Sequence, residues 1–282
     1  MQGEFILTAI TADPELVQAA DEAGVDRIGI DIERIGKLAR QGHVAHARLA
    51  AHQLDDVATV AAHTRHAAVF ARLNPLHEGS TEEVERALQL NARVLMLPYF
   101  TEAKEVASFV QIVDGRAEAV PLVETAAAVD RLSELVAIPG LREIMVGLND
   151  LQLSLALTNP FEIVVSDRMQ AIAECVRGAG LRFGFGGLAR VDDTSLPIPP
   201  DLIVAQYARL GASSAWLARS FFRGITASEV GPAVRALRER LRYWAVQPPA
   251  ALSGQRERLA AAIHAAIHAA VVPAATGEAL HP

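Results

Sequence analysis

The stretch AEAVPLVETAAAVDRLSELVAIPGLREIMVGLN, residues 117–149, contains the repeating unit from which the fold is predicted. Its two ends, AEAVPLVE (117–124) and EIMVGLN (143–149), are short apolar runs typical of buried strands. The segment between them has the apolar spacing of a helix. A strand, a helix and a second strand in this order predict a parallel β–α–β unit.

The same alternation extends in both directions from this unit. Further β-like runs are FILTAIT (5–11), RIGIDI (27–32), AAVFARL (67–73), RVLMLPY (93–99), RFGFGGLA (182–189) and ASSAWLA (212–218). Amphipathic stretches such as PELVQAADEAG separate them, so we predict an α/β protein with a closed (β/α)8 TIM barrel. The main alternative, an open doubly wound sheet, needs a glycine-rich turn after its first strand, and TAITADPEL has none.

The chain of 282 residues suits one barrel, which typically uses about 250 residues, followed by a short extension. We predict a catalytic barrel domain over residues 1–245 and a C-terminal helical extension and tail over 246–282. ASEVGPAVRALRERLRYWA is expected to form the last barrel helix, Gln247-Pro248-Pro249 to interrupt it, and SGQRERLAAAIHAAIHAA to form an extra helix that contacts other subunits. The last residues are expected to be frayed.

Composition excludes several classes of protein. A net charge of −7 and a pI of 5.7, with scattered basic residues, argue against a nucleic-acid partner. No apolar run approaches the roughly 20 residues that span a bilayer, and the N-terminus has no secretory pattern. The single cysteine, Cys175, excludes an internal disulfide and lies in a helical pattern that predicts a buried structural thiol. We therefore expect a cytoplasmic protein without a membrane partner.

Candidate functional residues are the polar side chains that close the predicted strands, because TIM-barrel active sites lie at the C-terminal ends of the strands. They are Asp31, Glu33, Arg72, Asn74, Glu124, Asn149 and Asp150. Glu124 and Asp150 follow neighbouring strands, and two converging carboxylates are costly unless a cation or a proton holds them together. Hard oxygen ligands favour Mg²⁺ or Mn²⁺, with Co²⁺ as a further option. The alternative is that each carboxylate caps the helix that follows it.

Arg72 is the candidate for binding a substrate carboxylate, because a guanidinium offers a planar fork of two donors. Its structural alternative is an ion pair with Asp31 or Glu33 on the neighbouring strand. In the tail, His264 and His268 have the i, i+4 spacing of metal ligands, but the AAIHAAIHAA duplication explains that spacing equally well.

These residues carry a family resemblance. VPLVETAAAVDRLSELVAIPGL and EIMVGLNDLQLSLAL resemble the metal-binding half of the aldolase/citrate lyase family, which includes 4-hydroxy-2-oxoheptanedioate aldolases, citrate lyase β-subunits and malyl-CoA lyases. DIERIGK resembles the family's Asp-x-Glu segment, ARLNPL its arginine segment and LRFGFGGLAR its seventh strand. The resemblance runs over roughly residues 5–225. It implies a pyruvate/phosphoenolpyruvate-type barrel, usually a homo-oligomer.

The resemblance also implies a role for each matching residue. Glu124 and Asp150 become metal ligands, Arg72 orients the 2-oxo acid carboxylate, and Asp31 and Glu33 contact metal-bound water. The chain departs from the family at Arg34, the residue directly after its Asp-x-Glu segment. The aldolases that it resembles have a histidine at this position, and the citrate-lyase branch tends to have an acidic residue. His43 or His52 would then supply the proton relay. Asn149 and Arg40 are further candidates for binding the anionic substrate.

We therefore predict a metal-dependent carbon–carbon lyase that cleaves or forms a 4-hydroxy-2-oxo acid through a pyruvate enolate. Its partners would be a small pyruvate-type 2-oxo acid and an aldehyde. A Schiff-base mechanism is disfavoured, because neither Lys37 nor Lys104 ends a strand. The alternatives are a CoA-thioester lyase of the citrate or malyl-CoA type and a metal-binding barrel without turnover.

Overall fold

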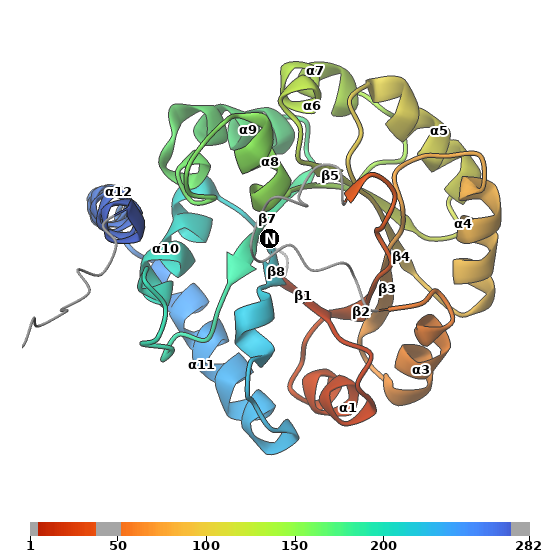
Figure 1. Ribbon diagram of the computed structural model, residues 1–282, viewed down its shortest axis with the longest axis horizontal. Coiled ribbons are helices and arrows are strands. Elements are labelled where there is room, and N and C mark those ends of the chain that lie inside the picture. Colours follow the sequence, from red (N-terminus) through yellow and green to blue (C-terminus); the bar gives the residue numbers. More distant parts are fainter. Residues whose placement is uncertain (1–4, 38–51, 272–282) are drawn as a thin grey trace, which may run out of the picture.

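The computed structural model describes residues 5–37 and 52–271 and contains a closed barrel of eight parallel strands (Figure 1). Each strand pairs with its sequence neighbours, and β8 closes the barrel by pairing with β1. The predicted TIM barrel with an extra C-terminal helix is confirmed. The strands are β1 (Ile6–Ile10), β2 (Arg27–Asp31), β3 (Ala68–Arg72), β4 (Val94–Leu97), β5 (Glu118–Val123), β6 (Glu143–Val146), β7 (Arg182–Leu188) and β8 (Ser214–Leu217).

Helices surround the strands as an outer ring (Figure 1). They are α1 (Pro14–Glu22), α3 (Asp56–His63), α4 (Ser80–Gln89), α5 (Ala103–Val113), α6 (Ala126–Asp130), α7 (Leu132–Leu135), α8 (Leu148–Ser154), α9 (Asp167–Gly178), α10 (Pro200–Leu210), α11 (Ala227–Ala245) and α12 (Pro249–Val271). Two 3-10 helices, η1 (Ile163–Val165) and η2 (Arg219–Phe222), lie in the connections. Among the described residues, no helix is long and apolar enough to cross a membrane.

Local sequence fixes where the helices begin. The Asp13 side chain accepts hydrogen bonds from the backbone N–H groups of Glu15 and Leu16, and Pro14 occupies the first turn, where its missing N–H costs nothing. In α11, Thr226 and Glu229 form a reciprocal capping box. Such caps satisfy backbone donors that the helix itself leaves unpaired.

The hydrophobic core has two layers. A small cluster fills the inside of the barrel and forms a base beneath its mouth; its buried members are Phe70, Val94, Met96, Val120, Leu122 and Met145. A larger cluster packs the outer faces of the strands against the helices. Cys175 belongs to the edge of this outer layer and is half-buried, so the expectation of a buried thiol is only partly met. Because the interior is filled, ligands can reach only the barrel's ends.

The N-terminal end of the barrel is closed by charged residues in balanced pairs. Arg27 Nη2 donates to Glu143 at 2.8 Å and to Glu118 at 3.0 Å, and Arg182 also pairs with both carboxylates. Two guanidinium groups therefore meet two carboxylates here. A buried charge is tolerated when it is paired in this way.

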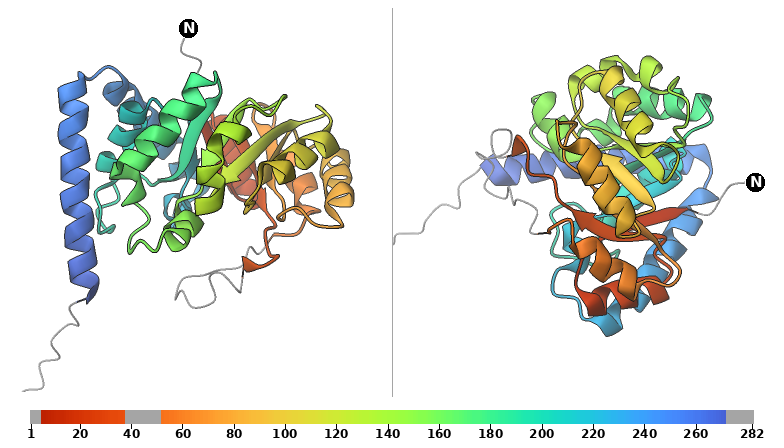
Figure 2. Two further views of the ribbon diagram at one scale, coloured as in Figure 1. Left: turned by 90° about the horizontal axis from the view of Figure 1, so that it is seen from above. Right: turned by 90° about the vertical axis from the view of Figure 1, so that its right-hand side faces the viewer.

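The extra helix α12 lies outside the ring and packs along α10 (Figure 2). It begins at Pro249, inside the predicted Gln247-Pro248-Pro249 interruption and ahead of Ser253, where the extra helix is predicted to begin from the sequence. Arg256 attaches it to the barrel by donating to the Val165 carbonyl and to the Asp167 carboxylate, both at 2.7 Å. The residues beyond 271, expected to be frayed, lie outside the described part of the chain.

Candidate active site

The ends of β2 and β3 place a carboxylate against a guanidinium at the C-terminal mouth of the barrel. Arg72 donates from Nε to Asp31 Oδ1 at 2.9 Å and from Nη2 to Asp31 Oδ2 at 2.6 Å. Its Nη2 also lies 3.3 Å from Glu33 Oε2, and the guanidinium lies over the Trp216 ring at 4.9 Å. The ion pair considered as an alternative role for Arg72 is thus present. It also fixes the orientation of the guanidinium at the mouth.

Glu124 follows β5 and points into the mouth. Its Oε1 accepts a hydrogen bond from the Tyr99 backbone N–H at 2.9 Å, and its side chain is 2% exposed. The cap of the following helix α6 is Thr125, whose hydroxyl accepts from Ala128 N–H at 3.0 Å. The capping role considered for Glu124 is therefore filled by its neighbour, which leaves the buried carboxylate for another purpose.

Asp150 reaches the same space from a helix rather than from a strand. The prediction that residues 143–149 form a strand that Asp150 closes is wrong at its end, because β6 stops at Val146 and α8 begins at Leu148. The chain turns at Gly147, so Asp150 lies in the first turn of α8 and is buried. The same turn leaves Asn149 exposed, and its predicted contact with substrate stays a prediction.

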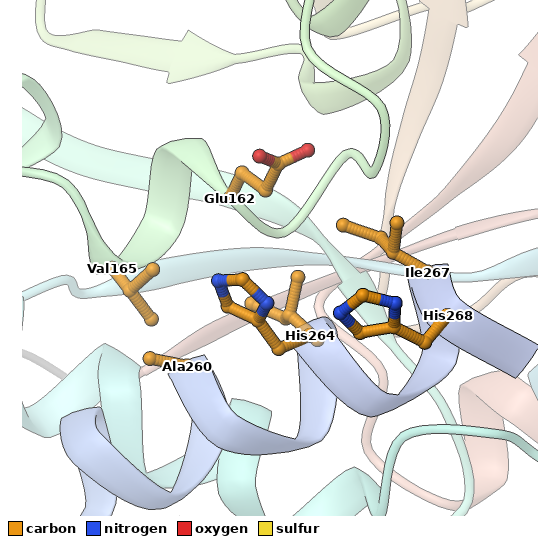
Figure 3. Close-up of a pocket in the computed structure, with 7 residues that line it drawn as sticks. Glu162, Val165, Ala260, His264, Ile267 and His268 are labelled. Atoms are coloured by element: carbon orange, nitrogen blue, oxygen red, sulfur yellow. The ribbon is translucent and has the colours of Figure 1, made fainter.

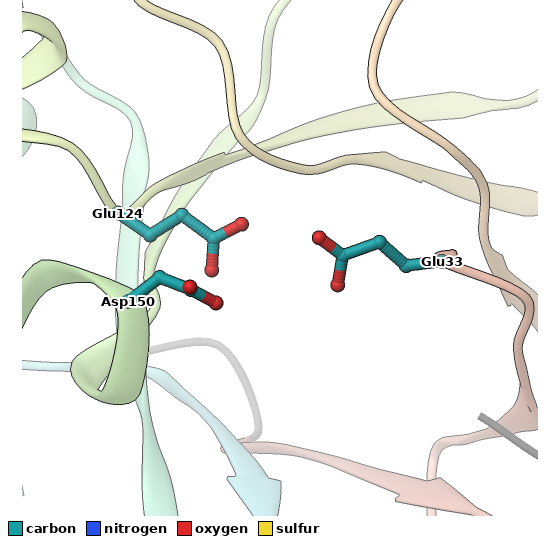
Figure 4. Close-up of side chains that lie close together, drawn as sticks. All are labelled: Glu33, Glu124 and Asp150. Carbon is teal, nitrogen blue, oxygen red and sulfur yellow. The ribbon is translucent and has the colours of Figure 1, made fainter. Parts of the chain in front are cut away.

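Glu33, Glu124 and Asp150 form a compact acidic cluster (Figure 4). Each residue offers one carboxylate oxygen, and these three oxygens lie within 4.8 Å of one another. Oxygens bound to one Mg²⁺ lie no more than about 4.2 Å apart, so the group has nearly the size of a coordination shell. Buried oxygen donors, with no histidine or cysteine among the described members of the cluster, fit a hard divalent cation such as Mg²⁺ or Mn²⁺.

The formal charge at the mouth supports the same fit. Lys37 Nζ lies 2.8 Å from Glu33 Oε2 and 3.7 Å from Asp31 Oδ2, and both Lys37 and Arg72 are buried. With Glu124 and Asp150, four carboxylates and two cations of the described residues face the mouth, a formal charge of −2 when every carboxyl group is ionised. The described ion pairs at the opposite end of the barrel show no such excess. One divalent cation would neutralise the excess at the mouth.

These charges alter the protonation of the cluster. Burial and the charge of Glu33 raise the pKa of Glu124 well above its usual range, and Arg72 only partly offsets them. Burial also acts to raise the pKa of Asp31, but the charge and hydrogen bonds of Arg72 outweigh it and hold that pKa well below its usual range. Asp31 is therefore a fixed anion beneath Arg72. The raised pKa of Glu124 favours its protonated form when no cation is bound.

Other candidates lie around the cluster or outside the described residues. Arg34 is exposed, and its guanidinium donates to the His52 carbonyl at 3.0 Å. The His52 ring lies beside the end of β2, with Nδ1 at 3.3 Å from the Asp31 backbone N–H. Its predicted role as a proton relay stays a prediction. His43 and Arg40 lie outside the described residues.

Lys37 is the site residue that sequence reasoning missed. It lies several residues beyond the end of β2, and apolar alternation alone gives no reason to place its side chain at the mouth. The structure instead brings its Nζ into the acidic cluster. The glycine directly before it, Gly36, was the available signal, because a glycine there permits a sharp reversal of the chain.

The histidine pair of α12 lies away from the mouth, beside Glu162 and Val165 (Figure 3). The His264 and His268 rings are exposed, with centroids 5.9 Å apart. Glu162 Oε1 already accepts backbone hydrogen bonds from Thr158 at 2.8 Å and Asn159 at 2.6 Å. Within the described residues, three metal-ligating side chains converge in the acidic cluster of the mouth and not at this pair.

Gly147 should be essential for the position of Glu124. A Cβ atom at this residue would lie 2.4 Å from Glu124 Oε2 and 2.9 Å from Glu124 Cβ. We expect Gly147→Ala to displace the carboxylate and weaken Mn²⁺ binding by about ten- to a hundredfold, as with other residues that orient metal ligands. Isothermal titration calorimetry would measure the affinity. Gly178→Ala is the matched control, because nothing lies within 4 Å of its added Cβ; equal affinities in the two variants would contradict the expectation.

Metal binding should release a proton. Because the pKa of Glu124 is raised when no cation is bound, a cation has to displace the Glu124 proton at pH values below that pKa. We expect the affinity for Mn²⁺ to rise with pH by about tenfold per pH unit below the raised pKa, and to level off above it. Calorimetry in buffers of different ionisation enthalpy would count the released protons. An affinity independent of pH from mildly acidic to neutral solution would argue against this protonation state.

The chain is similar to known proteins in sequence and in fold. A family model described as HpcH/HpaI aldolase/citrate lyase matches residues 5–190. No curated protein sequence matches the chain. Among solved structures, a HpcH/HpaI aldolase/citrate lyase family protein from Burkholderia cenocepacia has 20% identity and a TM-score of 0.59, covering 85% of this chain and 94% of that one.

Two further solved structures are similar in fold. A citrate lyase from Burkholderia xenovorans has 16% identity and a TM-score of 0.62, covering 100% of this chain and 88% of that one. The protein CitE from Mycobacterium tuberculosis, solved in complex with magnesium and acetate, has 16% identity and a TM-score of 0.59, covering 89% and 96%. At these identities the similarity concerns the fold. The family assignment rests on the sequence match over residues 5–190.

Proposed function

Because the chain belongs to the HpcH/HpaI aldolase/citrate lyase family, a family of carbon–carbon lyases, we propose that it is a metal-dependent aldolase. In this proposal it cleaves or forms a 4-hydroxy-2-oxo acid, with a pyruvate-type 2-oxo acid and an aldehyde as the two smaller partners. The observation that carries the proposal is the buried cluster of Glu33, Glu124 and Asp150 beside Arg72 at the barrel mouth.

The chemistry requires stabilisation of negative charge on the 2-oxo acid. Breaking the bond between C3 and C4 leaves an enolate whose oxygen lies next to the carboxylate. A divalent cation held by Glu124 and Asp150 would act as a Lewis acid toward that oxygen. The excess of two negative charges at the mouth is consistent with one such ion.

Arg72 is proposed to bind the substrate carboxylate. Its Nε and Nη2 are held by Asp31, and its guanidinium lies over Trp216, so the group is fixed before substrate arrives. A fixed guanidinium loses little entropy on binding a carboxylate and defines its orientation. Asp31 thus acts through Arg72, by positioning it.

Proton transfer is assigned to the β2 side of the mouth. Glu33 faces Glu124 and Asp150 (Figure 4), which supports a role as the group that accepts the 4-hydroxyl proton, directly or through one water molecule. His52, beside the Asp31 backbone, and His43 are proposed as the groups that exchange this proton with solvent. We further propose that the protein is cytoplasmic and acts as a homo-oligomer, with α12 as a subunit contact.

The test is release of pyruvate from a panel of 4-hydroxy-2-oxo acids, coupled to lactate dehydrogenase, with and without added Mg²⁺ or Mn²⁺. We expect release that requires the metal and stops on chelation. If no member of the panel releases pyruvate but acyl-CoA thioesters are cleaved, the substrate class would be the one associated with citrate and malyl-CoA lyases. If neither class reacts while Mn²⁺ still binds, the barrel would hold a metal without this turnover.

A further inference from the structure

Lys37 reaches the acidic cluster because the chain reverses directly after β2. The Lys37 backbone N–H donates to the Arg34 carbonyl at 3.1 Å, which closes a turn, and Gly36 in that turn has φ +71°. This left-handed conformation is characteristic of glycine. Asn74, in the loop after β3, holds the turn, since its Oδ1 accepts hydrogen bonds from the backbone N–H groups of Arg34 at 2.9 Å and Ile35 at 3.1 Å. The position of Lys37 is therefore built into the fold.

The Lys37 ammonium group lies between two carboxylates. Its Nζ donates to Glu33 Oε2 at 2.8 Å and lies 3.7 Å from Asp31 Oδ2. Arg72 Nη2 approaches the same Glu33 oxygen at 3.3 Å. The Lys37 side chain is 5% exposed and the Glu33 side chain 0%, so water screens these contacts little. Glu33 is thus held from one side by two cations and faces Glu124 and Asp150 on the other.

Without Lys37, Glu33 would compete for the cation. One of its oxygens already lies within 4.8 Å of an oxygen of each of the other two carboxylates, and loss of the ammonium group would make the mouth more negative by one charge. A third carboxylate on the ion would occupy a position that the 2-oxo acid needs. It would also weaken the ion as a Lewis acid and remove Glu33 as a proton acceptor.

We propose that Lys37 is a positioning residue that holds the Glu33 carboxylate off the metal ion, so that the ion is bound through Glu124 and Asp150. The inference rests on the proposed function. It predicts changes of opposite sign when Lys37 is removed: tighter metal binding and slower turnover. General damage to the site would weaken both.

The experiment measures two quantities separately. Mn²⁺ affinity is measured without substrate, by calorimetry and by electron paramagnetic resonance, and turnover is measured as pyruvate release. For Lys37→Met we expect roughly tenfold tighter Mn²⁺ binding, from the lost positive charge, and turnover lower by about ten- to a hundredfold. Lys37→Arg, which keeps the charge, should restore most of both values. Gly36→Ala should change both quantities in the same directions as Lys37→Met but less strongly, because it strains the turn and alters no charge.

A second pair of variants isolates Glu33. In a Glu33→Gln background, Lys37→Met should no longer tighten Mn²⁺ binding, because the competing carboxylate is absent. If Lys37→Met binds Mn²⁺ as the wild type does, or more weakly while its unfolding midpoint is unchanged, the inference is overturned and the proposed function stands. If the wild-type protein binds no Mn²⁺, the proposed function fails and this inference fails with it.

Discussion

Glu124→Gln should lose Mn²⁺ binding and reduce turnover by at least about a hundred- to a thousandfold, comparable to the loss of a key electrostatic group in other active sites. The substitution keeps the shape of the side chain and removes its charge. Glu124 is 2% exposed and its raised pKa shows that the buried anion is disfavoured when no cation is present. The metal-free variant should therefore be as stable as the metal-free wild type, or more stable.

The readouts for this variant are Mn²⁺ affinity, pyruvate release and the midpoint of thermal unfolding in the presence of a chelator. Glu134→Gln is a suitable control, because Glu134 is an exposed carboxylate on α7. We expect the control to match the wild type in all three. A Glu124→Gln protein that kept full affinity and turnover would show that the ion is held elsewhere. If turnover were lost while Mn²⁺ affinity stayed normal, Glu124 would have a role other than that of a metal ligand.

Arg72→Lys should reduce kcat/KM by about a hundred- to a thousandfold while Mn²⁺ still binds. Lysine keeps the positive charge beside Glu33 but lacks the planar fork that pairs with Asp31 at 2.9 and 2.6 Å. It also cannot present a guanidinium over Trp216. Orientation of the substrate carboxylate should suffer most, and the buried anion Asp31 would be less well satisfied. Arg72→Ala should in addition destabilise the fold by roughly 3–5 kcal/mol, the usual cost of breaking a buried ion pair.

Steady-state kinetics and calorimetry separate these effects. The expected pattern for Arg72→Lys is a large rise in KM for the 2-oxo acid, a lower kcat and nearly unchanged metal affinity. Guanidinium ion added to Arg72→Ala should recover part of the activity, because it can refill the site. Unchanged KM and kcat in Arg72→Lys would remove Arg72 from substrate binding and leave it only the ion pair with Asp31.

The barrel could be predicted because its signal repeats. Each strand is a short apolar run, and the alternation with helical stretches occurs eight times, so an error at one boundary does not change the topology. The boundary of β6 shows the limit. Leu148 continues the apolar residues of β6 in sequence, but Gly147 lets the chain turn and Leu148 starts α8. Apolar spacing alone does not mark that change.

The candidate site was predictable where it depends on strand order. Glu124 follows β5 and Arg72 ends β3, so barrel topology alone brings both to the mouth. Asp150 reaches the same space although its predicted element was wrong, because α8 begins directly after β6. Lys37 was missed because its position depends on the left-handed Gly36 and on Asn74, which lies in the loop after β3. Such a reversal brings together residues that no periodicity relates.

The two ends of the barrel show how charge indicates function in this fold. At the N-terminal end, Arg27 and Arg182 balance Glu118 and Glu143, which is sufficient for stability. At the C-terminal mouth, the carboxylates of the described residues exceed their cations by two when all are ionised, and these groups are buried. A buried excess of one charge is costly unless it is offset, so this arrangement favours a ligand of opposite charge.

The most direct test of the account is exchange of the methyl protons of pyruvate with deuterium in D₂O, followed by NMR. This half-reaction needs the cation, Arg72 and a base, and it does not require the aldehyde to be known. We expect the wild-type protein to exchange these protons only when Mg²⁺ or Mn²⁺ is present and to stop on chelation. In Glu124→Gln the rate should not exceed that of metal and buffer without protein. Exchange that persists with chelator or in Glu124→Gln, or no exchange with metal present, would contradict metal-assisted enolate formation at this site.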